Sequence, residues 1–127
     1  MSLIHVKNIK PVHKDDRGEI VDIFEGEVHH SGIITFTKGA VRANHYHRLQ
    51  RQYTYVIAGS IELKMKDALD PNAKTETVIM KAGDFVDVPP NVIHAYKGLS
   101  DASMICLTTR ERTSETYEDD TVRVDPI

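Results

Sequence analysis

Two histidines stand one residue apart near the middle of the chain, at His45 and His47. In an extended strand, alternate side chains project from the same face, so both imidazoles would point to one side and Tyr46 to the other. Two imidazoles on one face provide either half of a metal site or a pair of groups that exchange protons. The sequence therefore predicts metal or acid–base chemistry at this strand.

The histidine pair belongs to a longer series of residues with fixed spacing. A His-x-His pair by itself is often only a surface feature of a strand, so the positions around it decide how much it means. Here the pair is accompanied by a glutamine and enclosed by two glycines. In order, the series is Gly39, His45, His47, Gln52 and Gly59.

A second series contains Gly83, Pro89, Asn91 and His94. Together the two series resemble the two motifs of the cupin family, with glutamine where the family usually has glutamate and asparagine where it has a second glycine. Asparagine tolerates left-handed backbone angles better than other non-glycine residues, so that replacement is mild. The resemblance implies an all-β fold, a double-stranded β-helix or jelly-roll barrel. It further implies one domain over residues 1–127, with core motifs at 39–59 and 83–98.

Metal ligands at His45, His47, Gln52 and His94 are implied by the same resemblance. Neutral imidazoles bind divalent transition metals well, and an amide oxygen can complete the set. Because these ligands carry no negative charge, a bound dication would keep its full formal charge and act as a Lewis acid. We expect zinc, nickel, iron, manganese or copper, whereas magnesium and calcium are disfavoured by these ligand types.

A weaker resemblance concerns the substrate. The segment 14–22, which contains Asp-x-Arg-Gly, resembles the start of cupins that process nucleotide-linked deoxysugars, the 3,5-epimerases and 3,4-ketoisomerases. The segment 44–47 resembles part of the cupin domain in bacterial capsule-sugar reductases. These resemblances imply an isomerase or epimerase that acts on a sugar or keto-sugar, including nucleotide-linked ones, by removing a proton next to a carbonyl. In such ketoisomerases the histidine pair works without a metal.

Roles for individual residues follow from this second resemblance. His45 or His47 would be the general base, and a tyrosine would be the partner acid. Tyr96 is the best candidate because it shares a strand face with His94. The remaining residues, expected to contact substrate, are Tyr53, Tyr55, Arg17 and Arg42, the two arginines by pairing with a phosphate or carboxylate.

Other functions stay open at this level. A metal-dependent dioxygenase or lyase that acts on a small molecule would use the same ligands, and so would a non-catalytic cupin that binds a small ligand. The Asp-x-Arg-Gly segment is also typical of a simple tight turn, in which Arg17 would be solvated.

The elements that must position these residues are short strands. Nearly every segment alternates apolar with polar residues, which is typical of half-buried strands. Eight or so such strands, separated by turns, favour a sandwich or small barrel, and no helix is expected. The expected strands lie at 19–24, 32–37, 53–57, 61–65, 75–80, 85–88, 93–97 and 103–109.

Connections and ends complete the expected arrangement. We expect Gly59 to supply a positive φ in a hairpin between 53–57 and 61–65. His29 and His30 are expected in an exposed loop. The region 114–127 is expected to be an edge strand or a cover over the barrel, with a frayed tail as the alternative. The apolar residues of segment 4–9 could supply an exchanged strand in a homodimer, which is expected by analogy with other cupins of this size.

Composition limits the classes of partner. The 127 residues include 16 basic and 19 acidic side chains, a formal charge of −3, so no general basic field attracts nucleic acid. No segment has the pattern of a signal peptide or a membrane span. The one cysteine, Cys106, lies in an apolar run and is expected to be a buried small hydrophobe. We therefore expect a cytoplasmic protein with a small-molecule substrate.

Overall fold

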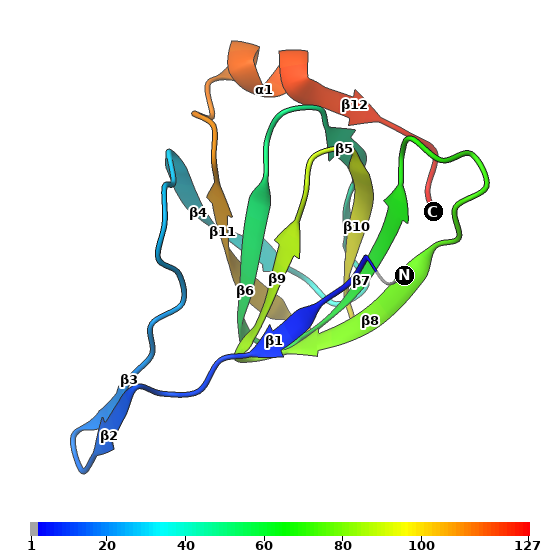
Figure 1. The fold of residues 1–127 in the computed structure, drawn as a ribbon. Helices are drawn as coiled ribbons and strands as arrows, with labels where there is room; N and C mark the ends of the chain where they lie inside the picture. Colours follow the sequence, from blue (N-terminus) through cyan, green and yellow to red (C-terminus); the bar gives the residue numbers. More distant parts are fainter. Residues whose placement is uncertain (1–2) are drawn as a thin grey trace.

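Two antiparallel five-stranded sheets enclose the interior of the protein in the computed structural model, which describes residues 3–127 (Figure 1). One sheet has the strand order β1-β9-β6-β11-β4, and the other has the order β12-β5-β10-β7-β8. The strands are β1 (Val6–Asn8), β2 (His13–Asp15), β3 (Gly18–Ile20), β4 (His30–Phe36), β5 (Val41–His47), β6 (Gln52–Ala58), β7 (Ser60–Asp67), β8 (Glu76–Lys81), β9 (Asp84–Val88), β10 (Val92–Gly98), β11 (Ala102–Thr108) and β12 (Thr121–Arg123). The all-β jelly-roll prediction is confirmed.

Alternation along the strands decides which side chains fill the interior. In β7, every second residue is fully buried, at Ile61, Leu63 and Met65, while the residues between them reach the surface. In β6 the inward positions begin with the polar Gln52 and Thr54. Polar side chains therefore enter the interior at the start of β6, and this part of the interior contains the candidate site.

The expected hairpin across Gly59 is not formed. Gly59 has the predicted positive φ of +80°, but β6 and β7 lie in different sheets. A side chain at Gly59 would collide with the carbonyl oxygen of Asp101 and with Ala102. The glycine is therefore required because the chain crosses from one sheet to the other in close contact with the segment before β11.

The C-terminal region contains an element that the sequence pattern did not predict. Residues Ser114–Asp120 form a short helix, α1, which lies above the end of the barrel in Figure 1. The side-chain oxygen of Thr113 accepts a hydrogen bond from the backbone N–H of Thr116, which caps the helix. The strand β12 then pairs with β5, as the edge-strand alternative predicted. No helix among residues 3–127 is long and apolar enough to span a membrane.

Three local differences concern the N-terminal half. Strand β3 ends at Ile20, so residues 21–24 are not the expected strand, and Phe24 instead packs on Tyr53 with ring centroids 4.4 Å apart. His30 begins β4 and is half-buried, whereas His29 is exposed as expected. Strand β1 pairs with β9 of its own chain. The hairpin of β2 and β3 projects away from the barrel (Figure 1).

Candidate functional site

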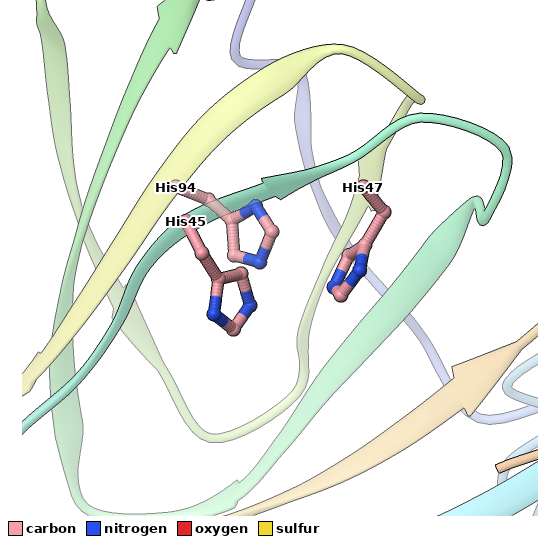
Figure 2. A group of neighbouring side chains, drawn as sticks. All are labelled: His45, His47 and His94. Atoms are coloured by element: carbon pink, nitrogen blue, oxygen red, sulfur yellow. The ribbon is translucent and has the colours of Figure 1, made fainter. Parts of the chain in front are cut away.

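Three imidazoles meet in this polar part of the interior. His45 and His47 come from β5 and His94 from β10, and His45 lies directly opposite His94 in the strand register. Their candidate ligand nitrogens all lie within 4.8 Å of one another, and Figure 2 shows the rings turned toward each other. The sequence prediction that these three residues converge therefore agrees with the structure.

A bulge in β5 shapes this part of the sheet. Asn44 has no partner between the pairs that His45 and Ala43 make with β10. Ala43 and Asn44 both have positive φ, at +75° and +58°, which is unusual for residues other than glycine. Bulges turn side chains away from the strict alternation of a strand. As a result, both Arg42 and Ala43 line the same cavity as His45.

Hydrogen bonds define which ring nitrogens are available. The Nδ1 of His94 lies 3.1 Å from the carbonyl oxygen of Val92, which can only accept, so Nδ1 carries the proton. The Nε2 of His94 is buried without a partner, and so is the Nε2 of His47. Buried nitrogens without partners are costly, and they indicate a ligand or a reacting group. The cluster therefore presents lone pairs to the space between the rings.

The three imidazoles are neutral near pH 7. Burial, reinforced by the other two histidines, lowers the pKa of His45 to about 3. Burial also lowers the pKa of His94 to about 4. The pKa of His47 is lowered by burial as well, although the Asp120 carboxylate opposes the shift. Neutral imidazole is the form that binds metals and accepts protons.

The donor set fits a divalent transition metal. The candidate ligand atoms of the three histidines lie within 4.8 Å of one another, and the Nε2 atoms of His47 and His94 are buried without a partner. Three neutral imidazoles suit zinc, nickel, iron, manganese or copper, and an amide oxygen is an acceptable fourth ligand. The residues that would hold the ion are His45, His47, His94 and Gln52.

Gln52 and Tyr96 belong to one buried polar network. The side-chain nitrogen of Gln52 donates to the Tyr96 hydroxyl at 3.2 Å, and Thr54 Oγ1 lies 2.8 Å from the same hydroxyl. Burial raises the pKa of Tyr96 well above its ordinary value. Because its amide nitrogen is engaged in this way, Gln52 retains its side-chain oxygen for other partners. Tyr96 remains a protonated phenol that lines the cavity.

A cavity of about 210 Å³ opens onto two of the three imidazoles, those of His45 and His94. Two arginines, Arg42 and Arg112, contribute to its wall, and neither an aspartate nor a glutamate is among its described lining residues. A wall with this charge favours a ligand that carries an anionic group. The lining residues are Ile34, Arg42, Ala43, His45, Gln52, His94, Tyr96, Met104, Cys106, Arg112 and Tyr117.

Several residues singled out from the sequence lie elsewhere. The cavity wall brings together Arg42, His45, His94, Gln52 and Tyr96, and His47 adjoins the two histidines. In contrast, Tyr53 and Tyr55 are on the outer face of β6, opposite the inward Gln52 and Thr54. Alternation in a strand explains this, because odd positions of β6 must face away from the cavity. Both tyrosines are therefore excluded from this chain's cavity.

Arg17 also lies outside the cavity of its own chain. It sits in the turn between β2 and β3, where its guanidinium nitrogen is 2.6 Å from the Asp15 carboxylate. This ion pair lowers the pKa of Asp15 to about 2. The geometry is that of the tight-turn alternative, in which the arginine is solvated.

Sequence reasoning missed the contribution of the C-terminal region. The ring of Tyr117 on α1 lies 5.6 Å from that of His47 and 6.3 Å from that of His45, centroid to centroid. The guanidinium carbon of Arg112 is 4.4 Å from the centre of the Tyr117 ring, a cation–π contact. The only sequence signal was an aromatic and a basic residue within a polar, acidic segment.

Cys106 lies in the cavity wall as well as in the apolar run that was noted from the sequence. The residue is buried, and burial raises the pKa of its thiol to about 11. The thiol therefore remains protonated and behaves as a small apolar group, as expected.

The fold and the site together define a β-barrel protein with a histidine-lined interior cavity. The family model of the cupin domain matches residues 32–110, which is more than half of the sequence. This chain belongs to the cupin domain family. The matched region runs from within β4 to beyond the end of β11 and includes all three histidines of the cluster. No curated protein matches the sequence.

Solved structures share this fold at low sequence identity. A 3′-monoepimerase from Streptomyces bikiniensis, determined in complex with dTDP-quinovose, has a TM-score of 0.83 and 20% identity, and the match covers 97% of this chain and 70% of that one. A 3,4-ketoisomerase from Helicobacter canadensis has a TM-score of 0.79 and 18% identity, with 98% and 92% covered. A dTDP-4-dehydrorhamnose 3,5-epimerase from Sulfolobus tokodaii has a TM-score of 0.73 and 22% identity, with 90% and 74% covered. At these identities, what is shared is the fold.

Proposed function

We propose that this protein is an isomerase or epimerase of sugars or keto-sugars, including nucleotide-linked ones, that removes a proton from the carbon next to a carbonyl. The observation that carries the proposal is the cluster of neutral imidazoles on a cavity that also contains a buried tyrosine and two arginines. A base, an acid and an anion-binding wall are the groups that such a reaction requires. The similarity to sugar epimerase and ketoisomerase folds supports it.

In the proposed reaction His45 is the base, because its ring lines the cavity and is only partly buried. An anionic substrate in the cavity would raise the pKa of His45 from its low value in the empty protein, which makes proton removal easier. Tyr96 would donate its proton to the substrate oxygen, where the charge of the enolate develops. Arg42 and Arg112 would pair with the phosphate groups of a nucleotide-linked sugar.

The metal belongs to a second version of the proposal, because a His45 lone pair that binds a metal is not available to remove a proton. A divalent ion held by the three histidines and Gln52 would supply a Lewis acid for a carbonyl or hydroxyl oxygen. Elemental analysis of protein that was purified without chelator tests this version. We expect about one equivalent of transition metal per chain, and loss of it in a His47→Asn variant but not in a His29→Asn variant. A metal-free wild-type protein that is still active would remove the metal from the proposal.

The experiment that tests the reaction uses a dTDP-4-keto-6-deoxysugar in deuterated water. Proton NMR should show exchange or epimerisation at the carbons beside the ketone, and an oxygen electrode should show no consumption of oxygen. Oxygen consumption that is coupled to substrate loss would instead support the dioxygenase alternative. Tight binding of the sugar nucleotide without any exchange would support the alternative of a non-catalytic binding protein.

A further inference from the structure

The hydroxyl of Thr121 contacts the cluster of three histidines at His47. Thr121 is the first residue of β12 and lies opposite His47 in the strand register. Its Oγ1 is 3.2 Å from the Nδ1 of His47, and both residues are buried. The contact has two possible directions, because an imidazole nitrogen either donates or accepts.

A second contact of the same hydroxyl decides the direction. Thr121 Oγ1 lies 2.5 Å from the backbone carbonyl oxygen of Tyr117. A carbonyl oxygen has no proton to give, and a hydroxyl has only one, so that proton goes to Tyr117. Oγ1 must then accept from His47, which means that Nδ1 carries the proton. The lone pair of His47 is therefore on Nε2, the atom that is buried without a partner.

The hydroxyl is held in place by the C-terminal helix. The backbone N–H of Thr121 donates to the carbonyl of Glu118 at the end of α1. The adjacent Asp120 carboxylate is buried and accepts from the backbone N–H groups of Leu49 and Gln50, at 2.7 and 3.0 Å. Leu49 and Gln50 lie in the loop that joins β5, which contains His47, to β6. Helix, loop and histidine therefore form one connected unit.

We propose that Thr121 is a positioning residue, which fixes the tautomer of His47 so that the Nε2 lone pair faces the other two imidazoles. Groups that hydrogen-bond the far nitrogen of a functional histidine set both its tautomer and its ring orientation. The inference does not depend on the proposed reaction, because a lone pair on Nε2 serves either a bound metal or proton transfer. It gives the C-terminal helix a function in the site beyond covering it.

Nitrogen NMR of the metal-free protein tests the proposal directly. Long-range ¹H–¹⁵N correlation spectra distinguish a protonated from an unprotonated ring nitrogen, and wild-type His47 should carry its proton on Nδ1. A Thr121→Val variant, which keeps the shape but loses the hydroxyl, should shift His47 to a mixture of tautomers or to the Nε2-protonated form. A Thr121→Ser variant, which restores the hydroxyl, should recover the wild-type pattern.

Thr108 provides a matched control. It is also buried, and its hydroxyl donates to the carbonyl of Arg110 rather than contacting a histidine, so a Thr108→Val variant should leave the His47 tautomer unchanged. Protonation of Nε2 in wild-type His47 would overturn the proposal even if every variant failed to fold. An unchanged tautomer in folded Thr121→Val protein would overturn it as well. Because no substrate is present, these outcomes are separate from the success or failure of the proposed reaction.

Discussion

Two neighbours outside the cavity determine where the protons of the imidazole cluster lie. The carbonyl of Val92 holds the proton of His94 on Nδ1, and the hydroxyl of Thr121 does the same for His47. Both Nε2 atoms consequently present lone pairs inside a buried site, where protonation is unfavourable. At the scale of single residues, the site is built to keep its histidines neutral.

This arrangement predicts how the metal-free protein responds to acid. Burial lowers the pKa of His94 from 6.5 to about 4, so between these values the unfolded chain binds a proton that the folded chain does not. The free energy of unfolding should therefore fall as the pH drops from 6.5 to 4, with His94 contributing roughly 3 kcal/mol to the loss. Urea titrations across this range, with chelator present, measure the effect.

Two variants separate the cluster from the general effect of acid. His94→Gln removes the buried imidazole and should make the stability of the protein less dependent on pH in this range. His5→Gln replaces an exposed histidine and should retain the wild-type dependence. If the curves of both variants coincide with that of the wild-type protein, the imidazole of His94 is not held neutral by the fold.

At the scale of elements, the turn at Gly59 connects β6 in one sheet to β7 in the other. Gly59→Ala should destabilise the protein by more than about 1 kcal/mol, because φ is positive and the new Cβ would collide with the backbone at Asp101. Gly39→Ala is the matched control, since Gly39 has a similar φ of +86° but no neighbouring heavy atom within 4 Å. Urea unfolding should show the larger loss for Gly59→Ala. Equal losses would mean that close contact is unimportant there.

The sequence predicted the positions of the strands better than the contacts between them. Alternation predicted most strands of the barrel, and the resemblance of the two motifs to those of cupins implied that His94 meets His45 and His47. Asn91 does adopt the left-handed conformation, at a φ of +63°, that its place in the second motif suggested. Alternation could not assign β6 and β7 to different sheets, because sheet membership depends on contacts between distant strands.

The candidate site shows the same limit. Strand parity with Gln52 would have placed Tyr53 and Tyr55 on the outer face, whereas Arg42 reaches the cavity through a bulge that leaves no clear signal in the sequence. Tyr117 enters on the short helix α1, and Arg112 enters from the segment just before it, and both regions look like an ordinary solvated segment in the sequence. The position of the helix depends on the buried Asp120 and on tertiary hydrogen bonds rather than on helix propensity.

At the scale of the whole molecule, one face of the barrel is apolar and only partly covered by the chain itself. A row in register crosses four strands of the first sheet on its outer side: Ile33, Ile105, Tyr55 and Phe85. Ile33 is 71% exposed. The hairpin of β2 and β3, which projects from the barrel, contains the exposed Ile20, and the exposed Val12 lies just before it. An isolated two-stranded hairpin is only marginally stable in water. We propose that a second copy of the chain covers this face and packs on the hairpin.

Sedimentation at micromolar concentration tests the homodimer. The wild-type protein should sediment as a dimer, and Ile33→Asp should shift it toward monomer, because the aspartate would place a charge in the apolar row. Ile79→Asp is the control, since Ile79 is also exposed but lies on β8 in the other sheet. A monomeric wild-type protein, or equal effects of both substitutions, would contradict this assignment.

In the proposed reaction, the site at the three imidazoles removes a proton from a carbon next to a ketone. The most direct measurement is the rate at which solvent deuterium enters a dTDP-4-keto-6-deoxysugar, compared between wild type, His45→Asn and Tyr53→Phe. We predict exchange by the wild-type and Tyr53→Phe proteins, and a loss of about 100-fold or more in His45→Asn, in line with the usual contribution of a general base. Exchange that is unaffected by loss of His45, or no exchange by the wild-type protein, would contradict the account.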